Sequence, residues 1–210
     1  MPVTTSKRGS FIVLEGIDGA GTTTQLQNLV AWGKGLGRGV TPSFEPSDGP
    51  IGAYIRSALR GERTPPPQDA IALMFAADRL DHVSRVIEPG LKRGDLVFCD
   101  RYVGSSLAYQ GSLCEPGWVR QINSRATIPD LTLYLRIDPD VALERVSHRE
   151  GAHRDMYETK ELLERISSAY DQVYGVTGAR ELDAVVIDAA APIDEVFRAC
   201  CAAVESHGLL

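Results

Sequence analysis

The sequence has no basic excess, no cysteine pair with metal-binding spacing and no long hydrophobic run. Its 210 residues carry 22 Lys and Arg against 28 Asp and Glu, and the net charge of −6 argues against a dedicated nucleic-acid-binding protein. A nucleotide is not excluded, because a local pocket can be cationic on an acidic protein. The four cysteines form no CxxC pair, so neither a zinc site nor a disulfide framework is expected.

A membrane-spanning segment and a signal peptide are also not expected. No run of about 18 apolar residues is present. The N-terminal MPVTTSKRGS has no apolar core, and the FIVLEG that follows is short and ends in charge. We therefore expect a cytoplasmic protein with free thiols, folded as one domain over 1–210.

Short apolar runs alternate with longer amphipathic stretches along the chain. The runs are bounded by Gly, Asp, Pro or charged residues, which predicts strands buried on both faces of a parallel sheet. The stretches between them have helical spacing, and the longest is expected to stop at Pro89-Gly90. The predicted strands are 11–14, 40–44, 96–99, 131–135 and 184–187, and the predicted helices are 23–32, 69–87, 140–149, 158–174 and 192–204. This alternation predicts an α/β fold, a doubly wound parallel sheet of five strands with helices on both faces and ligands at the carboxyl ends of the strands.

The segment FIVLEGIDGAGTTTQLQ follows the order strand, glycine-rich turn, helix. Its glycines let the backbone turn so that successive N–H groups point inward, and the helix adds the positive end of its dipole, which together fit nucleotide phosphates. The glycine spacing G-x-x-G-x-G and the lack of an acidic residue at the end of the next strand argue against a dinucleotide-binding Rossmann fold. A glycine-rich strand-to-helix turn that binds no phosphate remains as the alternative to a phosphate-binding loop. The expected ATP-binding residues are Gly16, Gly19, Ala20, Gly21, Thr22, Thr23 and Thr24.

The Walker A pattern G-x-x-x-x-G-K-[ST] of P-loop proteins is matched except at its lysine. Gly16 and Gly21 fit the glycines, and Thr23 fits the hydroxyl that would bind Mg²⁺. The lysine position holds Thr22, which offers the β- and γ-phosphates a hydroxyl but no charge. Without compensation, we expect phosphoryl transfer to slow by about 10²–10³-fold.

Four further segments, taken with the EGIDGAG loop, resemble the bacterial thymidylate kinase family. They are LMFAADR at 73–79, DRY through SSLAYQG at 100–111, PDLTLYL at 129–135 and an arginine-bearing stretch at 149–158. These segments span nearly the whole chain and occur in the same order as in that family. The resemblance implies a P-loop NTPase-type kinase domain with a lid at about 148–158, which uses ATP and Mg²⁺ to convert dTMP to dTDP for dTTP synthesis and forms a homodimer.

The resemblance also assigns residues to the acceptor nucleotide. Phe75 and Arg79 share one helix face, so that Phe75 can stack on thymine while Arg79 donates to its edge. Arg101 follows a buried strand and would clamp the acceptor phosphate. The alternatives are a core phenylalanine with a surface arginine, and a capping ion pair of Asp100 and Arg101.

Ser106, Tyr109 and Gln110 are expected beside base and sugar, with Tyr109 disfavouring a ribose 2′-hydroxyl; a solvated loop is the alternative. Asp18 is assigned to the acceptor 3′-hydroxyl and Mg²⁺, with a helix-start acid as the alternative. Members of this family with a small residue at the Gly19 position supply a catalytic arginine from the lid, so the resemblance implies this role for Arg149 and Arg154. The alternative is that the stretch containing them is a solvated basic loop.

Taken together, the predicted catalytic residues are Asp18, Arg101, Arg149 and Arg154; the substrate-binding residues are Asp18, Phe75, Arg79, Arg101, Ser106, Tyr109, Gln110 and Tyr157; and the metal ligands are Thr23 and Asp18. Phe44 stands where the family often has an arginine near the acceptor phosphate, so either Arg101, Arg149 and Arg154 take over its role or phosphoryl transfer is weakened. Two alternatives remain open. One is a kinase for another deoxynucleotide or a deoxynucleoside, and the other is a catalytically impaired nucleotide-binding protein, which Thr22 and Phe44 would favour.

Overall fold

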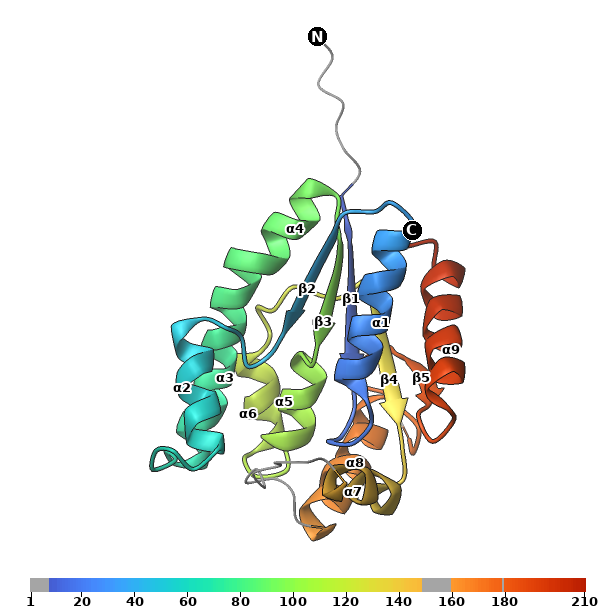
Figure 1. Cartoon of the computed structure of the whole chain (residues 1–210). Helices are drawn as coiled ribbons and strands as arrows, with labels where there is room; N and C mark the ends of the chain where they lie inside the picture. The colour runs from blue at the N-terminus through green and yellow to red at the C-terminus, as the bar shows by residue number, and fades with distance from the viewer. Residues whose placement is uncertain (1–7, 149–159, 179) are drawn as a thin grey trace.

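The structure, a computed structural model, describes residues 8–148, 160–178 and 180–210. Its five strands form one sheet in the order β2-β3-β1-β4-β5 (Figure 1). Every pairing between neighbouring strands is parallel, which confirms the predicted five-stranded sheet. The strands are β1 Ser10–Glu15, β2 Val40–Phe44, β3 Leu96–Asp100, β4 Leu131–Arg136 and β5 Val185–Asp188.

The central strands β1, β3 and β4 are mostly apolar and buried because both faces of the sheet are covered there. In β1, Ile12 and Leu14 belong to one hydrophobic cluster, whereas Phe11 and Val13 belong to the cluster on the other side. This division follows from the alternation of side chains along a strand. All residues of β3 are buried as well.

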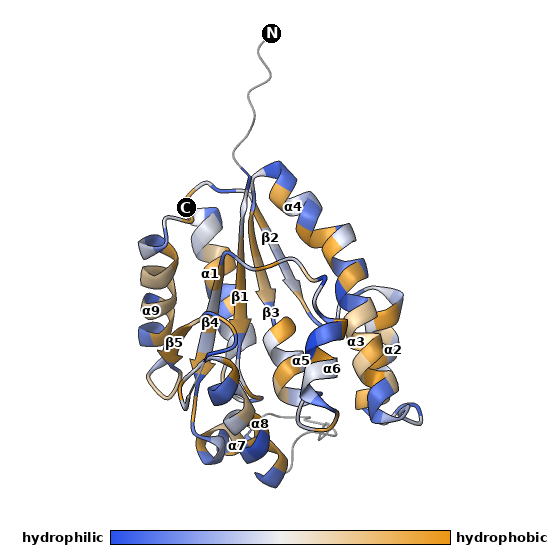
Figure 2. Cartoon of the chain, turned by 180° about the vertical axis from the view of Figure 1, so that it is seen from behind, coloured by the Kyte–Doolittle hydropathy of each residue, from blue (hydrophilic) through white to orange (hydrophobic). Residues whose placement is uncertain are grey.

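Helices pack on both faces of the sheet (Figures 1 and 2). Helices α1 and α9 lie together over one face, the π-helical turn η1 and α4 cover β2 and β3 on the other, and α5 packs against α8 at the carboxyl ends of the strands. The helical elements are α1 Thr22–Gly35, α2 Pro50–Leu59, α3 Gln68–His82, η1 Val83–Ile87, α4 Glu88–Arg93, α5 Val103–Tyr109, α6 Pro116–Ile122, α7 Pro139–Ser147, α8 Lys160–Val173 and α9 Ile193–Ser206.

The predicted helix stop at Pro89-Gly90 is wrong. The helical path continues from α3 through η1 into α4 and ends before Gly94, whose φ of 83° is left-handed. The N–H of Glu88 donates to the carbonyl of Val83, five residues earlier, so a π turn precedes the proline. Pro89 then stands in the first turn of α4, where its missing N–H is tolerated.

Three short helices, α2, α5 and α6, were not predicted. Each has ten residues or fewer, too short to show a clear apolar period. Local signals did exist in α6, since Glu115 caps it by accepting from the N–H groups of Gly117 and Trp118, and Pro116 begins it. In the part of the chain that the structure describes, no helix is long and apolar enough to cross a membrane. All four cysteines are free thiols.

Candidate active site

The glycine-rich loop between β1 and α1 is shaped by two left-handed glycines. Gly19 and Gly21 have φ values of 87° and 89°, which side chains disfavour. A Cβ on Gly19 would lie only 2.4 Å from the carbonyl oxygen of Ala142 in α7. The loop therefore has no room for a side chain at position 19. Thr22, at the lysine position, begins α1 with its side chain buried.

The hydroxyl of Thr23 meets the carboxylate of Asp100 at the end of β3. Thr23 Oγ1 donates to Asp100 Oδ2 at 2.6 Å. The second carboxylate oxygen of Asp100 is buried and has no hydrogen-bond partner among the described residues. A hydroxyl and a carboxylate with a spare oxygen fit a hard cation such as Mg²⁺. Asp100 was not among the predicted metal ligands, although an acid that ends the strand beside the phosphate-loop strand is the Walker B signal.

Arg101 follows Asp100 and adopts a left-handed backbone, with a φ of 69°. Its guanidinium donates to Asp18 Oδ1 at 2.7 Å, to the carbonyl of Gly16 at 2.8 Å and to the Tyr109 hydroxyl at 3.2 Å. The Tyr109 hydroxyl in turn donates to Asp18 Oδ2 at 3.1 Å. Burial raises the pKa of Tyr109 well above its ordinary value, so this hydroxyl stays protonated at neutral pH. Asp18, predicted near the metal, is thus tied to Arg101 and Tyr109.

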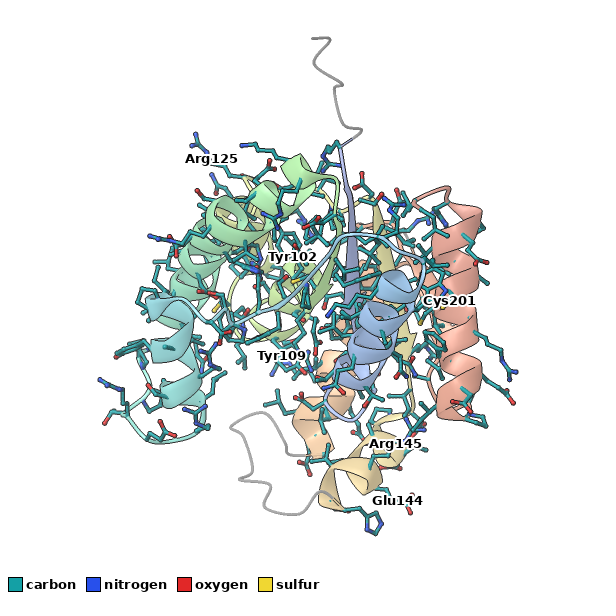
Figure 3. The ribbon with its side chains drawn as sticks, turned by 45° about the horizontal axis from the view of Figure 1, so that its top comes forward. Tyr102, Tyr109, Arg125, Glu144, Arg145 and Cys201 are labelled. Atoms are coloured by element: carbon teal, nitrogen blue, oxygen red, sulfur yellow. The ribbon has the colours of Figure 1, made fainter. Side chains whose placement is uncertain are left out.

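A cavity of about 150 Å³ lies beside this group. Figure 3 shows Tyr109 between α1 and the α2 side of the molecule. Seven predicted site residues line the cavity: Asp18, Phe75, Arg79, Arg101, Ser106, Tyr109 and Gln110. The remaining lining residues, which were not predicted, are Glu45, Pro46, Leu59, Tyr102 and Ser105. Glu45 follows β2 directly, so its position at a strand's carboxyl end was the available signal.

Arg79 is held rigidly in the wall of this cavity. It is 1% exposed, and its Nη2 lies 2.8 Å from Glu45 Oε2 and donates to the carbonyl of Tyr102 at 2.9 Å. Its Nη1 donates to Ser106 at 3.1 Å and to Asn123. The Nε–H is buried without a partner among the described residues. The surface-charge alternative for Arg79 is therefore wrong.

Ser106 and Gln110 are also buried, at 1% and 3% exposure, because they lie in and next to α5. The solvated-loop alternative for this segment is wrong. The structure brings the phosphate loop, the strand-end acid and the polar cavity to one edge of the sheet.

Comparisons with known proteins agree with this arrangement. The family model described as thymidylate kinase matches residues 14–200. The chain belongs to the thymidylate kinase family. It is 42% identical over 197 residues to the probable thymidylate kinase of Pyrobaculum calidifontis, covering 93% of this chain and 95% of that protein. It is 38% identical over 202 residues to the thymidylate kinase of Leifsonia xyli subsp. xyli, covering 93% and 94%, and 41% identical over 192 residues to the probable thymidylate kinase of Methanococcus maripaludis, covering 89% and 90%.

In this member of the thymidylate kinase family, the guanidinium of Arg56, from helix α2, lies beside Phe44. Arg56 of α2 lies over the exposed Phe44 ring, 5.7 Å from its centroid, and donates to the carbonyl oxygens of Pro46 and Ser47. The substitutes expected from the sequence for the missing arginine are Arg101, Arg149 and Arg154. Arg56 was not considered, because twelve residues separate it from Phe44.

The predicted lid residues Arg149, Arg154 and Tyr157 lie outside the described residues. The elements on either side, α7 and α8, pack against each other. Glu144 and Arg145 lie on α7, towards the same end of the sheet as the phosphate loop (Figure 3). The Arg145 guanidinium donates to the carbonyl of Ala189 at 2.9 Å, which ties α7 to the segment after β5.

Proposed function

We propose that this chain is a single-domain thymidylate kinase that transfers the γ-phosphate of ATP to dTMP and forms dTDP for dTTP synthesis. The observation that carries the proposal is the cavity that unites Phe75, Arg79, Arg101 and Tyr109 beside the phosphate loop. Membership of the thymidylate kinase family supports the same activity.

The acceptor would lie in this cavity. Phe75 would stack on thymine, and Arg79, which lines the same cavity, would donate to the base edge. Ser106 and Gln110 would border the base and the sugar, and Asp18 would accept from the 3′-hydroxyl. Arg101 would align the acceptor phosphate, because it lines the cavity at the side of the phosphate loop, next to Asp18 and the carbonyl of Gly16.

Transfer would be in line, and positioning and charge stabilisation would do most of the work. Backbone N–H groups from Gly19 to Thr24 would bind the ATP phosphates, and Thr23 and Asp100 would hold Mg²⁺, with Asp18 nearby. The bound cation would neutralise triphosphate charge. Among residues 8–148, 160–178 and 180–210 no cluster of three metal-ligating side chains occurs, so phosphate oxygens and water would have to complete the shell of the cation.

The arginine that stabilises the transferring phosphoryl group would come from Arg149 or Arg154. Gly19 leaves no space for a side chain in the loop, so a loop arginine at that position is sterically blocked. Tyr157 would approach the acceptor from the same lid.

We further propose a cytoplasmic homodimer joined through α3. This helix exposes an apolar stripe of Leu73, Ala77 and Leu80, and Leu73 and Leu80 are 50% and 42% exposed. Leu80→Glu should convert the dimer to a monomer in sedimentation experiments, and a wild-type monomer would refute this part of the proposal.

Function is tested by ADP release with MgATP and each of dTMP, dUMP, ribosyl TMP, dCMP and dAMP. We expect turnover of about 1 s⁻¹ or more on dTMP, the low end of usual enzyme rates. Thr22→Lys should raise this rate if the missing lysine limits transfer, and Thr64→Lys, which adds the same charge on an exposed connection, should not. Binding without turnover, restored by Thr22→Lys, would show a silenced kinase.

A further inference from the structure

Glu15, the last residue of β1, is a buried carboxylate outside the ligand cavity. It is 0% exposed. Its Oε1 accepts from the backbone N–H groups of Tyr102 at 2.9 Å and Ser105 at 3.1 Å. Its Oε2 accepts from the hydroxyls of Ser105 at 2.6 Å and Tyr170 at 3.0 Å. A buried carboxylate is costly unless its oxygens are satisfied, and here four donors converge on it.

Three of the four donors belong to Tyr102 and Ser105, in the segment that follows Arg101, and the fourth is the Tyr170 hydroxyl of α8. A non-glycine residue at a φ of 69° is strained and persists only where its surroundings hold it. The N–H of Arg101 donates to the carbonyl of Leu14 at 2.8 Å, and its own carbonyl accepts from the Cys99 thiol at 3.1 Å. The next N–H, that of Tyr102, is bound by Glu15. The end of β1 therefore holds the peptide groups on both sides of Arg101.

The start of α5 is packed tightly against the same carboxylate. A Cβ on Gly104 would lie 1.9 Å from the Tyr174 hydroxyl and 2.9 Å from Glu15 Oε1. The turn thus has little room to adopt another path while Glu15 is in place. Loss of the carboxylate would leave two backbone N–H groups unpaired and would favour relaxation of the left-handed residue.

We propose that Glu15 is a positioning residue for phosphoryl transfer, which holds the strained turn so that the Arg101 guanidinium faces the acceptor phosphate. This inference rests on the proposed function, since it assigns Arg101 to that phosphate. Glu15 does not line the ligand cavity and acts through the backbone of Tyr102 and Ser105.

The first test compares Glu15→Ala with Glu15→Gln in full kinetics. Alanine should lower kcat/KM for dTMP by about 10²-fold, the effect of a displaced catalytic group, and leave KM for ATP within about twofold. Glutamine should recover most of the loss, because its carbonyl can still accept from both backbone N–H groups while its amide donates to the hydroxyls. Equal losses for both variants, or an equal rise in both KM values, would overturn the proposal.

The second test is a double-mutant cycle with Arg101→Gly. Glycine adopts a φ near 69° without strain and removes the guanidinium. If Glu15 acts through Arg101, then Glu15→Ala should change kcat/KM by less than about twofold in the Arg101→Gly background. A full additional loss there would show that Glu15 acts by another route.

Tyr134→Phe is the matched control for Tyr170→Phe. Both tyrosines are buried and donate to a buried carboxylate, Tyr134 to Asp171 at 2.9 Å and Tyr170 to Glu15 at 3.0 Å. Only Tyr170→Phe should lower kcat/KM for dTMP. Because the Tyr170 hydroxyl also accepts from Arg101 Nη1 at 3.4 Å, the loss should in addition disappear in the Glu15→Ala background. Equal effects of the two variants, or a full further loss in that background, would contradict the proposal. Wild-type turnover of dTMP is measured first and decides the proposed function independently. A structure of Glu15→Ala that retains the left-handed Arg101 would refute positioning even if the enzyme is active.

Discussion

Replacing Gly19 by alanine tests whether the phosphate loop depends on its close contact with α7. Gly19 has a φ of 87°, and an added Cβ would lie 2.4 Å from the carbonyl oxygen of Ala142. Alanine in the left-handed region costs about 1–2 kcal/mol, and overpacking against backbone costs about 1–3 kcal/mol more. We therefore expect the free energy of unfolding to fall by about 2–5 kcal/mol.

Gly37→Ala separates these two costs. Gly37 has a φ of 73°, but nothing lies within 4 Å of its added Cβ, so only the conformational cost applies. The two variants should differ by about 1–3 kcal/mol, which corresponds to about 2–12 °C in Tm for a chain of this size. Thermal and urea unfolding followed by circular dichroism would measure the difference.

The contact should also be visible in nucleotide binding. Either the loop or α7 must move to admit the methyl group, so Gly19→Ala should weaken binding of a non-hydrolysable ATP analogue in calorimetry, whereas Gly37→Ala should not. Equal losses of Tm in the two variants, or unchanged binding of the analogue by Gly19→Ala, would refute the argument that α7 constrains the loop.

Three further predictions concern single side chains. Tyr109→Phe removes the hydroxyl that donates to Asp18 at 3.1 Å, so kcat/KM for dTMP should fall about tenfold while the preference over ribosyl TMP persists. Tyr109→Ala should also reduce that preference, and an unchanged ratio of the two kcat/KM values would exclude a steric role for the ring. Asp100→Asn removes the charge beside Thr23, and half-maximal activity should then require about tenfold more Mg²⁺; an unaltered Mg²⁺ titration would separate Asp100 from the metal. Burial raises the pKa of Glu15 above its ordinary value of 4.5. The stability of the folded state that depends on protonated Glu15 is therefore fully present below pH 4.5 and is lost as the pH rises from there through the raised pKa. The Tm of Glu15→Gln relative to the wild type should therefore increase as the pH rises from 4 to 8. A Tm difference that stays constant over this range would contradict a raised pKa for Glu15 in the folded state.

The central strands could be predicted most clearly because both faces of the sheet are covered there. Residues Leu96–Asp100 are all buried, so an unbroken apolar run marked β3 in the sequence. Helix α5 could not be predicted in the same way. Its seven residues, VGSSLAY, are buried largely by α8, which lies more than fifty residues later in the chain.

The cavity residues could be named because the motifs that carry them follow strands or lie on one helix face. The strand order then brings Asp18, Phe75 and Arg101 to the same edge of the sheet. Their roles in binding and catalysis remain predictions. Arg79 illustrates what motifs leave open, because its ion pair with Glu45 and its single unpartnered donor follow from packing.

The sequence by itself determined the parallel α/β architecture and the phosphate-binding loop, since both depend on local patterns of apolar residues and glycines. Only the tertiary structure decided that Thr23 meets Asp100, that Arg56 lies over Phe44 and that Glu15 holds the turn at Arg101. These pairs join residues on different elements that lie apart in the chain. Thr23 and Asp100, for example, differ by 77 in residue number. No local preference encodes such contacts, because they form only when the strands and helices have packed and buried polar groups must find partners.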